Sequence, residues 1–275
     1  MKLSLPTTIG YGHRTALLEA LNQMKKGEKP LIELDWAEVS GISPAGLGML
    51  ACLFDTAVEH HCRLTHEGQN KAMKNIPVVQ NLNEANRFRI LPKPMIHNQI
   101  LKDSILEGQE TTLNLSFIEK FIDKFQNDLS DDLAFSCRLI VNELMQNSID
   151  HSGAERYYLC GGIHKKDTNA EVELGILDMG VSIQAKLRQK YEAPNDEEYL
   201  DLAFKEGTST RRARPGGLGL FHTLEHLRNH EGTLIVMSGG AQIIRYFKSK
   251  TVRRRKLKFP LHGTWCLARF PIQGH

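Results

Sequence analysis

The strongest constraint in this sequence is a segment from Ser130 to His151, which carries apolar and polar residues in two separate helical stripes. Ser130 and the two aspartates after it supply oxygen atoms that can cap the first turn of a helix. The apolar stripe predicts a helix packed on a core and consists of Leu133, Cys137, Ile140, Val141 and Leu144. One face also holds polar residues at i, i+4, i+7 and i+8, namely Glu143, Asn147, Asp150 and His151. The sequence therefore predicts that one face of this helix packs on a core and that another face forms part of a polar site.

Short strands and helices are expected on both sides of this segment, which predicts an α/β fold. The expected strands are Arg156–Ile163, Glu171–Leu177, Thr233–Met237, Gln242–Phe247 and Thr264–Phe270. The expected helices are Phe117–Phe125, Tyr199–Glu206 and Leu220–Arg228.

The N-terminal part of the chain reads as a β-α-β unit. Its pattern predicts a strand over Leu31–Trp36, a helix over Ala45–His61 and a strand over Cys62–His66. Pro92 and Pro94 then interrupt the chain and mark the preferred domain boundary. We therefore expect an N-terminal domain over residues 1–95, a linker over 96–113 and a C-terminal domain over 114–275.

Length and composition fit this two-domain organisation. The 275 residues suffice for two modest domains. Because 35 Lys and Arg nearly balance 32 Asp and Glu, the global charge favours neither nucleic acid nor an anionic membrane as a partner. The five cysteines are scattered without zinc-ligand spacing, which indicates reduced thiols. No signal peptide and no run of about 18 apolar residues is present, so a soluble cytoplasmic protein is expected.

Three polar or glycine-rich sites follow one another along the C-terminal half: Glu143 with Asn147, Asp178 with Gly180, and the stretch Gly216–Leu220. Each alone is a weak signal, because solvated helices, strand ends and turns often carry such residues. Their order and their helix and strand contexts together make a far more specific pattern.

Together the three sites resemble the N, G1 and G2 boxes of GHKL nucleotide-binding domains, the fold of histidine kinases, anti-sigma-factor serine kinases, gyrase and Hsp90. Ile140–Ser152 resembles the N box of the anti-sigma-factor kinases, and Glu206–Thr210 resembles their lid. Gly263–Thr264 resembles the Gly-Thr before the last strand of histidine kinase catalytic domains. The resemblance covers about Asn114 to Ile272. It implies a Bergerat-type two-layer α/β sandwich with a mixed sheet that binds ATP and Mg²⁺.

The resemblance assigns roles that agree with elementary chemistry. Magnesium prefers oxygen ligands and keeps several waters and phosphate oxygens, so the amide oxygen of Asn147 is the expected metal ligand. Glu143, one turn earlier, is the expected general base for a hydroxyl or water that attacks the γ-phosphate. Asp178 is expected to accept a hydrogen bond from the adenine amino group, and Gly180 to let the base come close.

The phosphates are expected at the glycine-rich stretch. Gly216, Gly217 and Gly219 can present backbone amides, and Leu220 begins a helix whose N-terminus favours anions. The remaining candidate nucleotide-binding residues are Leu218, Asp150 and Thr264. For Asp150 and His151 a helix-terminal cap or packing contact is favoured over direct phosphate contact.

Two departures from the family pattern are visible. Ser182 stands where the family often has a second glycine, so a tighter backbone without loss of binding is expected there. Arg211, Arg212 and Arg214 fall in the expected lid, where a γ-phosphate contact and a solvated loop are both open.

Residues 1–95 resemble a STAS domain of the anti-sigma-factor antagonist kind. The resemblance rests on Leu31–Asp35, on Val39–Gly48 before a long helix, and on Asn81–Phe88. In that family an Asp-Ser pair precedes the helix and its serine is phosphorylated, whereas Ser43 and Pro44 stand here. A helix-capping role is favoured for Ser43 over phosphorylation. The resemblance therefore implies an interaction or regulatory module.

Two functions follow as hypotheses. In the first, the chain is a signalling kinase of the anti-sigma type that acts on a serine of a protein partner. In the second, ATP binding and slow hydrolysis drive a switch that the N-terminal domain reports by protein–protein contact. A homodimer stays open. The basic run Arg253–Lys258 lacks interleaved aromatics and is interpreted as a charged hairpin tip rather than a nucleic-acid site.

Overall fold

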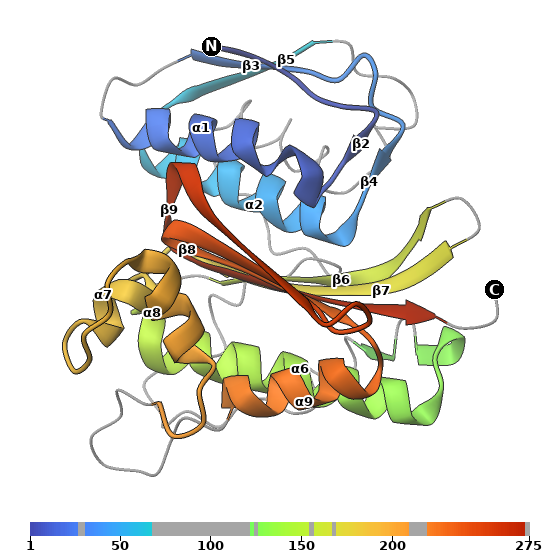
Figure 1. Ribbon diagram of the computed structural model, residues 1–275. Coiled ribbons are helices and arrows are strands. Elements are labelled where there is room, and N and C mark those ends of the chain that lie inside the picture. The colour runs from blue at the N-terminus through green and yellow to red at the C-terminus, as the bar shows by residue number, and fades with distance from the viewer. Residues whose placement is uncertain are drawn as a thin grey trace, which may run out of the picture.

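The protein is described by a computed structural model that covers residues 1–26, 31–67, 122–123, 126–153, 157–166, 169–208 and 219–272. Figure 1 shows four layers: an N-terminal sheet, a pair of helices, a second sheet and a second helical layer. The fold is α/β, as predicted. The predicted boundary near Pro92, the linker over 96–113 and most of the helix over 117–125 lie outside the described residues.

The first layer is a parallel sheet of order β1-β3-β5, with bounds Lys2–Ser4, Leu31–Asp35 and Arg63–Glu67. Two helices, α1 (Arg14–Lys25) and α2 (Pro44–Glu59), lie beneath it (Figure 1). The short parallel pair β2 and β4 (Thr8–Ile9 and Gly41–Ile42) and the turn η1 (Tyr11–His13) connect these elements. The predicted β-α-β unit is confirmed; β1, β2, β4 and α1 were not predicted.

Helix α2 begins as the sequence predicts and then comes unusually close to its neighbours. The Ser43 hydroxyl accepts a hydrogen bond from Gly46 N at 3.3 Å, which confirms the capping interpretation. A Cβ on Gly46 would overlap the backbone of Ile9, and one on Gly48 would lie 3.2 Å from the Cys160 sulfur. Glycine normally weakens a helix by about 1 kcal/mol, so these two glycines trade helix propensity for close packing.

The second sheet has the order β6-β7-β9-β8, with bounds Tyr157–Lys166, Asn169–Asp178, Thr251–Ile272 and Thr233–Tyr246. All its described strand pairs are antiparallel, so the mixed sheet that we expected is not found among the described strands. The two strands predicted over 233–247 are one strand, β8, which bends where its register shifts between Ser238 and Ala241.

The basic run does not form a hairpin tip, contrary to the prediction. The turn between β8 and β9 is Phe247–Lys250, and residues 253–258 lie in β9, where 253–256 pair with β8. Arg254 shares Asp201 of α8 with Arg245. The prediction failed because the basic run is exposed, and an exposed strand can pair its backbone with β8 even when its side chains are charged.

The helical layer below the sheet is built from α6 (Asp131–Asn147) and α9 (Gly219–Asn229). Ser130 caps α6 by accepting from Leu133 N at 3.3 Å, as predicted. A π-helical turn, η3 (Ser148–Ser152), extends α6, and a 3-10 turn, η2 (Gln126–Asp128), precedes it. The helices α7 and α8 (Ile183–Leu187 and Asp196–Ala203) lie beside the bent part of β8.

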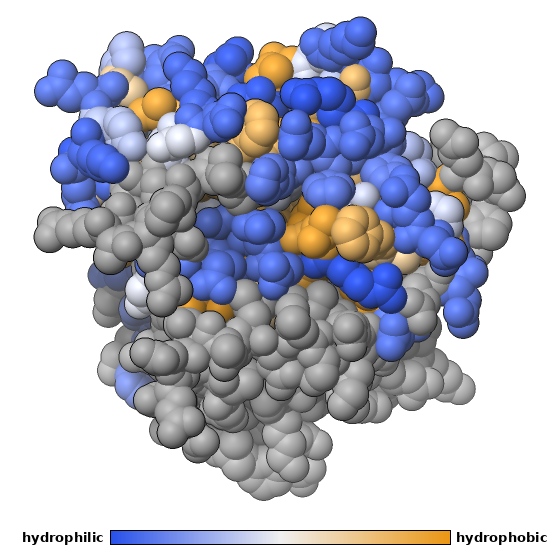
Figure 2. Space-filling model, turned by 90° about the horizontal axis from the view of Figure 1, so that it is seen from below, coloured by the Kyte–Doolittle hydropathy of each residue, from blue (hydrophilic) through white to orange (hydrophobic). Residues whose placement is uncertain are grey.

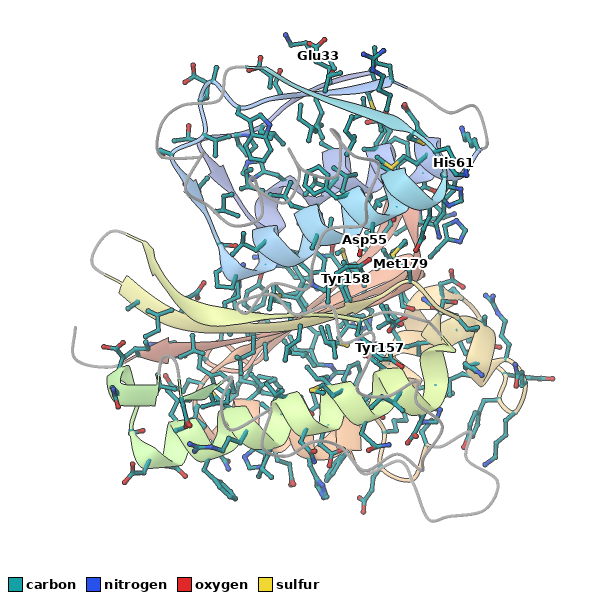
Figure 3. All side chains as sticks on the ribbon, turned by 180° about the vertical axis from the view of Figure 1, so that it is seen from behind. Glu33, Asp55, His61, Tyr157, Tyr158 and Met179 are labelled. Carbon is teal, nitrogen blue, oxygen red and sulfur yellow. The ribbon has the colours of Figure 1, made fainter. Side chains whose placement is uncertain are left out.

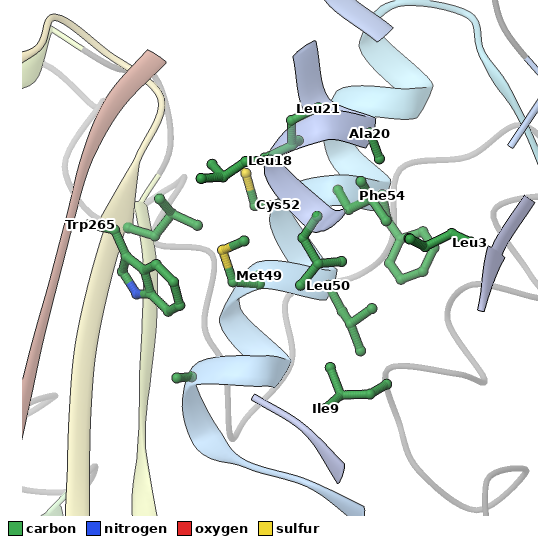
Figure 4. Packing of buried hydrophobic residues seen from close by; sticks show 14 of the residues in the cluster. Leu3, Ile9, Leu18, Ala20, Leu21, Met49, Leu50, Cys52, Phe54 and Trp265 are labelled. Carbon is green, nitrogen blue, oxygen red and sulfur yellow. The ribbon is translucent and has the colours of Figure 1, made fainter. Parts of the chain in front are cut away.

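The opposite face of the second sheet is covered by α1 and α2, so the sheet is buried on both sides. In Figure 4, Trp265 of β9 faces Met49 of α2 and Leu18 of α1, and all three belong to one buried cluster. Figure 3 shows Tyr158 beside Asp55 above the sheet and Tyr157 below it. The Tyr158 hydroxyl donates to the Asp55 carboxylate at 2.9 Å. The expected two-layer sandwich therefore carries a third layer from the N-terminal part.

Charged groups also join the two parts. Glu173 of β7 is fully buried and points toward α2. One carboxylate oxygen accepts from Ala45 N at 2.6 Å and from the Ser43 hydroxyl at 3.0 Å, and the other accepts from Arg269 at 2.7 Å. The negative charge thus lies at the positive N-terminus of α2 and beside a guanidinium.

No described helix has the length and apolar character needed to cross a membrane.

Candidate functional site

Asp178, the last residue of β7, is the centre of the candidate site. It is 2% exposed and lies on the sheet face that carries α6 and α9, opposite to the face of Glu173. Its carboxylate accepts from Gly180 N at 3.0 Å. Burial raises the pKa of Asp178 to about 7, although hydrogen bonds from the backbone of Gly180 and Thr264 and from the Ser148 side chain oppose this shift.

The backbone around Asp178 requires the glycine at 263. Asp178 pairs with Thr264 across β7 and β9, and a Cβ on Gly263 would overlap the Asp178 carbonyl. Gly263 also has a φ of 105°, which favours glycine. The Gly-Thr pair singled out in the sequence therefore lies directly against the aspartate, and Thr264 is part of the site.

Ser238 of β8 fixes the loop that follows Asp178. Its hydroxyl donates to the Gly263 carbonyl at 2.8 Å and accepts from Ile183 N at 2.9 Å, and its carbonyl accepts from Gln184 Nε2 at 2.6 Å. This serine was not predicted from the sequence. Its only signal was a polar residue at the end of an apolar strand, just before two glycines.

Ser182 precedes α7 and acts as its N-cap by accepting from Ala185 N at 3.3 Å. The serine that departs from the family pattern thus has a local structural role. Gly180, two residues earlier, donates its backbone N–H to Asp178, so this loop folds back onto the carboxylate.

The polar face of α6 ends over Asp178. Ser148, the first residue after α6, is buried, and its side chain hydrogen-bonds to Asp178. Asn147, next to it, has a buried Nδ2 with no hydrogen-bond partner among the described residues. Glu143 lies one turn earlier and is partly exposed, while Asp150 in η3 is exposed. Ser148 is a second functional candidate that the sequence analysis missed.

The N-terminus of α9 lies near the same end of α6. The two helices pack antiparallel, since Asp132 at the start of α6 approaches His230 just after α9 at 3.4 Å, and Ser136, one turn later, contacts His226 at 3.1 Å. Glu143 lies two turns beyond Ser136, and Gly219 lies two turns before His226, which places the start of α9 alongside Glu143. The predicted helix start at Leu220 is confirmed to within one residue.

The remaining predicted site residues fall outside the described part of the chain. These are Gly216, Gly217 and Leu218, together with the lid arginines Arg211, Arg212 and Arg214. His151 lies in η3 and is partly exposed.

A metal ion at this site would depend on few protein ligands. Within the described ranges, no group of three or more His, Cys, Asp or Glu residues could hold a metal. The Asn147 amide fits magnesium with phosphates, because its oxygen can coordinate the ion while its unpartnered Nδ2 can donate to a phosphate oxygen.

The outer surface of the helical layer is mainly hydrophilic where it is described, with a small apolar area (Figure 2). Phe135 on α6 is the most exposed large apolar side chain among the described residues, at 55%. It stacks edge-on against His226 rather than near Asp178.

No protein-family model and no curated protein matches this chain.

Proposed function

We propose that this chain binds ATP with Mg²⁺ between α6, the end of β7 and the start of α9, and transfers the γ-phosphoryl group to a protein partner, as anti-sigma-factor serine kinases do. The observation that carries the proposal is Asp178, a buried carboxylate whose described partners are all neutral and whose pKa is raised to about 7. Such groups concentrate at functional sites.

Asp178 suits an adenine base for a simple reason. The amino group of adenine is a neutral hydrogen-bond donor, and a carboxylate in a dry site gains strongly from such a donor. The loop from Gly180 to Ser182 and the network around Ser238 hold the carboxylate in place. Ser148 and Thr264 complete the wall around it.

The phosphates would lie toward α6 and α9. The N-terminus of α9 offers backbone amides and a positive dipole end to an anion. Asn147 would hold magnesium, which when bound would neutralise charge on the transferring phosphoryl group. Glu143 lies on the same face as Asn147 and near the start of α9, where a base must lie to accept a proton from an attacking hydroxyl.

A second function is favoured by one observation. Strand β7 holds Asp178 on one face and Glu173, the link to α2, on the other. A nucleotide-dependent movement of β7 would therefore act directly on the N-terminal layer. This arrangement suits an ATP-gated switch whose STAS-like part contacts a partner without phosphotransfer.

Ser43, the serine before α2, is a poor phosphate acceptor in this arrangement. The Ser43 hydroxyl is buried, bonded to Glu173 and on the sheet face opposite to Asp178. We therefore expect the acceptor hydroxyl on another protein.

Calorimetry with ATP, GTP and ADP in the presence of Mg²⁺ tests the proposal. We expect ATP binding that Asp178→Asn weakens by about 100-fold, equivalent to about 3 kcal/mol. Asp132→Asn, at the exposed start of the same helix α6, is the matched control and should bind as the native protein does. Absence of ATP binding, or equal affinity for ATP and GTP, would overturn the proposed site.

γ-Labelled ATP then separates the two functions. Label on a partner protein, lost in Glu143→Gln, supports the kinase. Release of free phosphate, with different partner affinity in ADP and in a non-hydrolysable ATP analogue, supports the switch.

A further inference from the structure

Two buried hydrogen-bond donors lack partners at the junction of the N-terminal layer and the β8–β9 hairpin. Tyr11 is 9% exposed and Gln242 is fully buried. The Tyr11 hydroxyl and the Gln242 Nε2 atom have no hydrogen-bond partner among the described residues. Buried polar groups are normally satisfied, so two unpaired donors in one region call for an acceptor.

Arg14 of α1 brings these two residues together. Its Nε donates to the Gln242 Oε1 atom at 2.8 Å, which turns the Nε2 atom of Gln242 away from this bond. Its guanidinium lies over the Tyr11 ring, 4.4 Å from the ring centroid, and its Nη1 reaches the Tyr11 carbonyl at 3.4 Å. Both unpaired donors therefore belong to side chains that contact one guanidinium.

Further positive charge comes from β9. Burial raises the pKa of Tyr11 to about 12, while the charges of Arg14, Arg269 and Arg255 oppose that rise. The groups that act on Tyr11 include no carboxylate. Arg269 is neutralised by Glu173, but Arg255 is exposed and makes no ion pair within the described residues.

Arg253 adds a third cation on the same side of the hairpin. It is exposed, and its guanidinium stacks over Tyr246, 5.3 Å from the ring centroid. Residues 253 and 255 alternate with Arg254, which points to the other side and pairs with Asp201. The junction thus combines three guanidinium groups with two donors, and no ion pair of these three guanidinium groups is found within the described residues.

We propose that Arg14, Arg253 and Arg255, with the Tyr11 hydroxyl and the Gln242 amide, form a binding site for a phosphate-type oxyanion. A phosphate group offers several acceptor oxygens and negative charge, and guanidinium forks match its geometry. The two unpaired donors are shielded from solvent, so the ligand must displace an overlying side chain to reach them.

This site is independent of the proposed nucleotide site. Tyr11 packs beside Trp265, on the sheet face opposite to Asp178. An oxyanion bound there would connect α1 with the hairpin and so would stabilise the contact between the two parts of the chain. The oxyanion can be free phosphate or the phosphate of a monoester, since the chemistry is the same.

Titration calorimetry of the full chain with inorganic phosphate, at ionic strength held constant with sodium chloride, tests the proposal. We expect binding that weakens by about tenfold or more in Arg253→Gln/Arg255→Gln, two exposed positions whose change should leave the fold intact. Tyr11→Phe keeps the ring and should weaken binding by a smaller factor. Glycerol phosphate in a parallel titration shows which source the site prefers.

The control is Lys248→Gln/Lys250→Gln, which removes the same charge from the turn of the same hairpin. It should bind phosphate as the native chain does. Binding that is absent at about 10 mM phosphate, unchanged in the arginine variant, or equally weakened in the lysine control would overturn the site. Asp178→Asn should not change phosphate binding here, which separates this test from that of the nucleotide site.

Discussion

The two faces of strand β7 bury one carboxylate each, and the environments of these carboxylates differ. Glu173 has a guanidinium, a backbone amide at a helix N-terminus and a hydroxyl around it. Asp178 has two backbone amides and a hydroxyl, and no cation acts on it within the described structure. Burial is nearly complete for both. The lesson is that the partners of a buried charge, more than its burial, separate a structural acid from a candidate functional one.

The largest expected change in stability is at Glu173. Glu173→Ala removes the acceptor for Ser43, Ala45 and Arg269 from a buried site, and we expect a loss of about 3 kcal/mol in the free energy of unfolding. Urea denaturation measures it. Glu171→Gln is the control, because Glu171 is partly exposed and lies 3.6 Å from the same guanidinium; it should cost less than about 1 kcal/mol. Equal losses of unfolding free energy in the two variants would show that Glu173 has no special structural role.

The raised pKa of Asp178 should make the free energy of unfolding depend on pH. The folded carboxyl holds its proton up to about pH 7, whereas an unfolded aspartate releases it near pH 4, so the folded state binds the extra proton between these values. The free energy of unfolding should therefore fall as pH rises through this window, by about 2 kcal/mol between pH 5 and pH 7. Asp178→Asn should lack this slope, and parallel curves for the two proteins would contradict the raised pKa.

The protonation of Asp178 also predicts the direction in which ATP affinity changes with pH. A donor from adenine favours the ionised form of Asp178, so ATP affinity should fall as pH drops below about 7, by up to tenfold per pH unit. We expect Glu173→Ala to leave this pH profile unchanged.

Tyr158 tests the polar contact above the sheet at a smaller scale. Tyr158→Phe leaves the buried carboxylate of Asp55 without its 2.9 Å donor, and we expect a loss of about 1.5 kcal/mol in unfolding free energy. Tyr246→Phe, at a partly exposed tyrosine on the same sheet, should change stability by less than about 0.5 kcal/mol. A neutral Tyr158→Phe would mean that this hydrogen bond contributes little to holding the N-terminal layer.

Gly48 gives the smallest effect. Gly48→Ala should gain helix propensity and lose a similar amount to crowding by the Cys160 sulfur, so the net change should stay near zero. In a Cys160→Ala background the same substitution should stabilise by about 1 kcal/mol. The double-mutant cycle measures this coupling. Gly12→Ala, where a Cβ meets nothing within 4 Å, should respond equally in both backgrounds.

The sequence predicted the elements that carry strong periodicity and caps. Helix α6, its Ser130 cap, the strand that ends at Asp178 and the start of α9 all lie close to where the pattern put them. These features depend on local chemistry. The glycine at 263 is also local chemistry, because a Cβ there would overlap the Asp178 carbonyl and its φ of 105° favours glycine.

The contacts between distant segments could not be predicted in the same way. Glu173 alternates with apolar residues like any solvent-facing strand residue, and nothing local shows that α2 covers it. Helix α1 has no side-chain cap that would mark its start in the sequence. Strands β2 and β4 have only two residues each, which is too short for a recognisable pattern. Ser148 and Ser238 gain their roles only when α6, β7 and β8 meet.

The burial of the second sheet on both faces also has a consequence for synthesis on the ribosome. Helices α1 and α2 are made well before Trp265 and Leu267 of β9, which cover them. At ordinary elongation rates the ribosome needs roughly 10 to 40 s to add the intervening 200 residues. During that time the apolar side of α1 and α2 that packs on the second sheet is not yet covered by β9. We therefore expect this apolar side to be exposed to aggregation on the ribosome until β9 has been made.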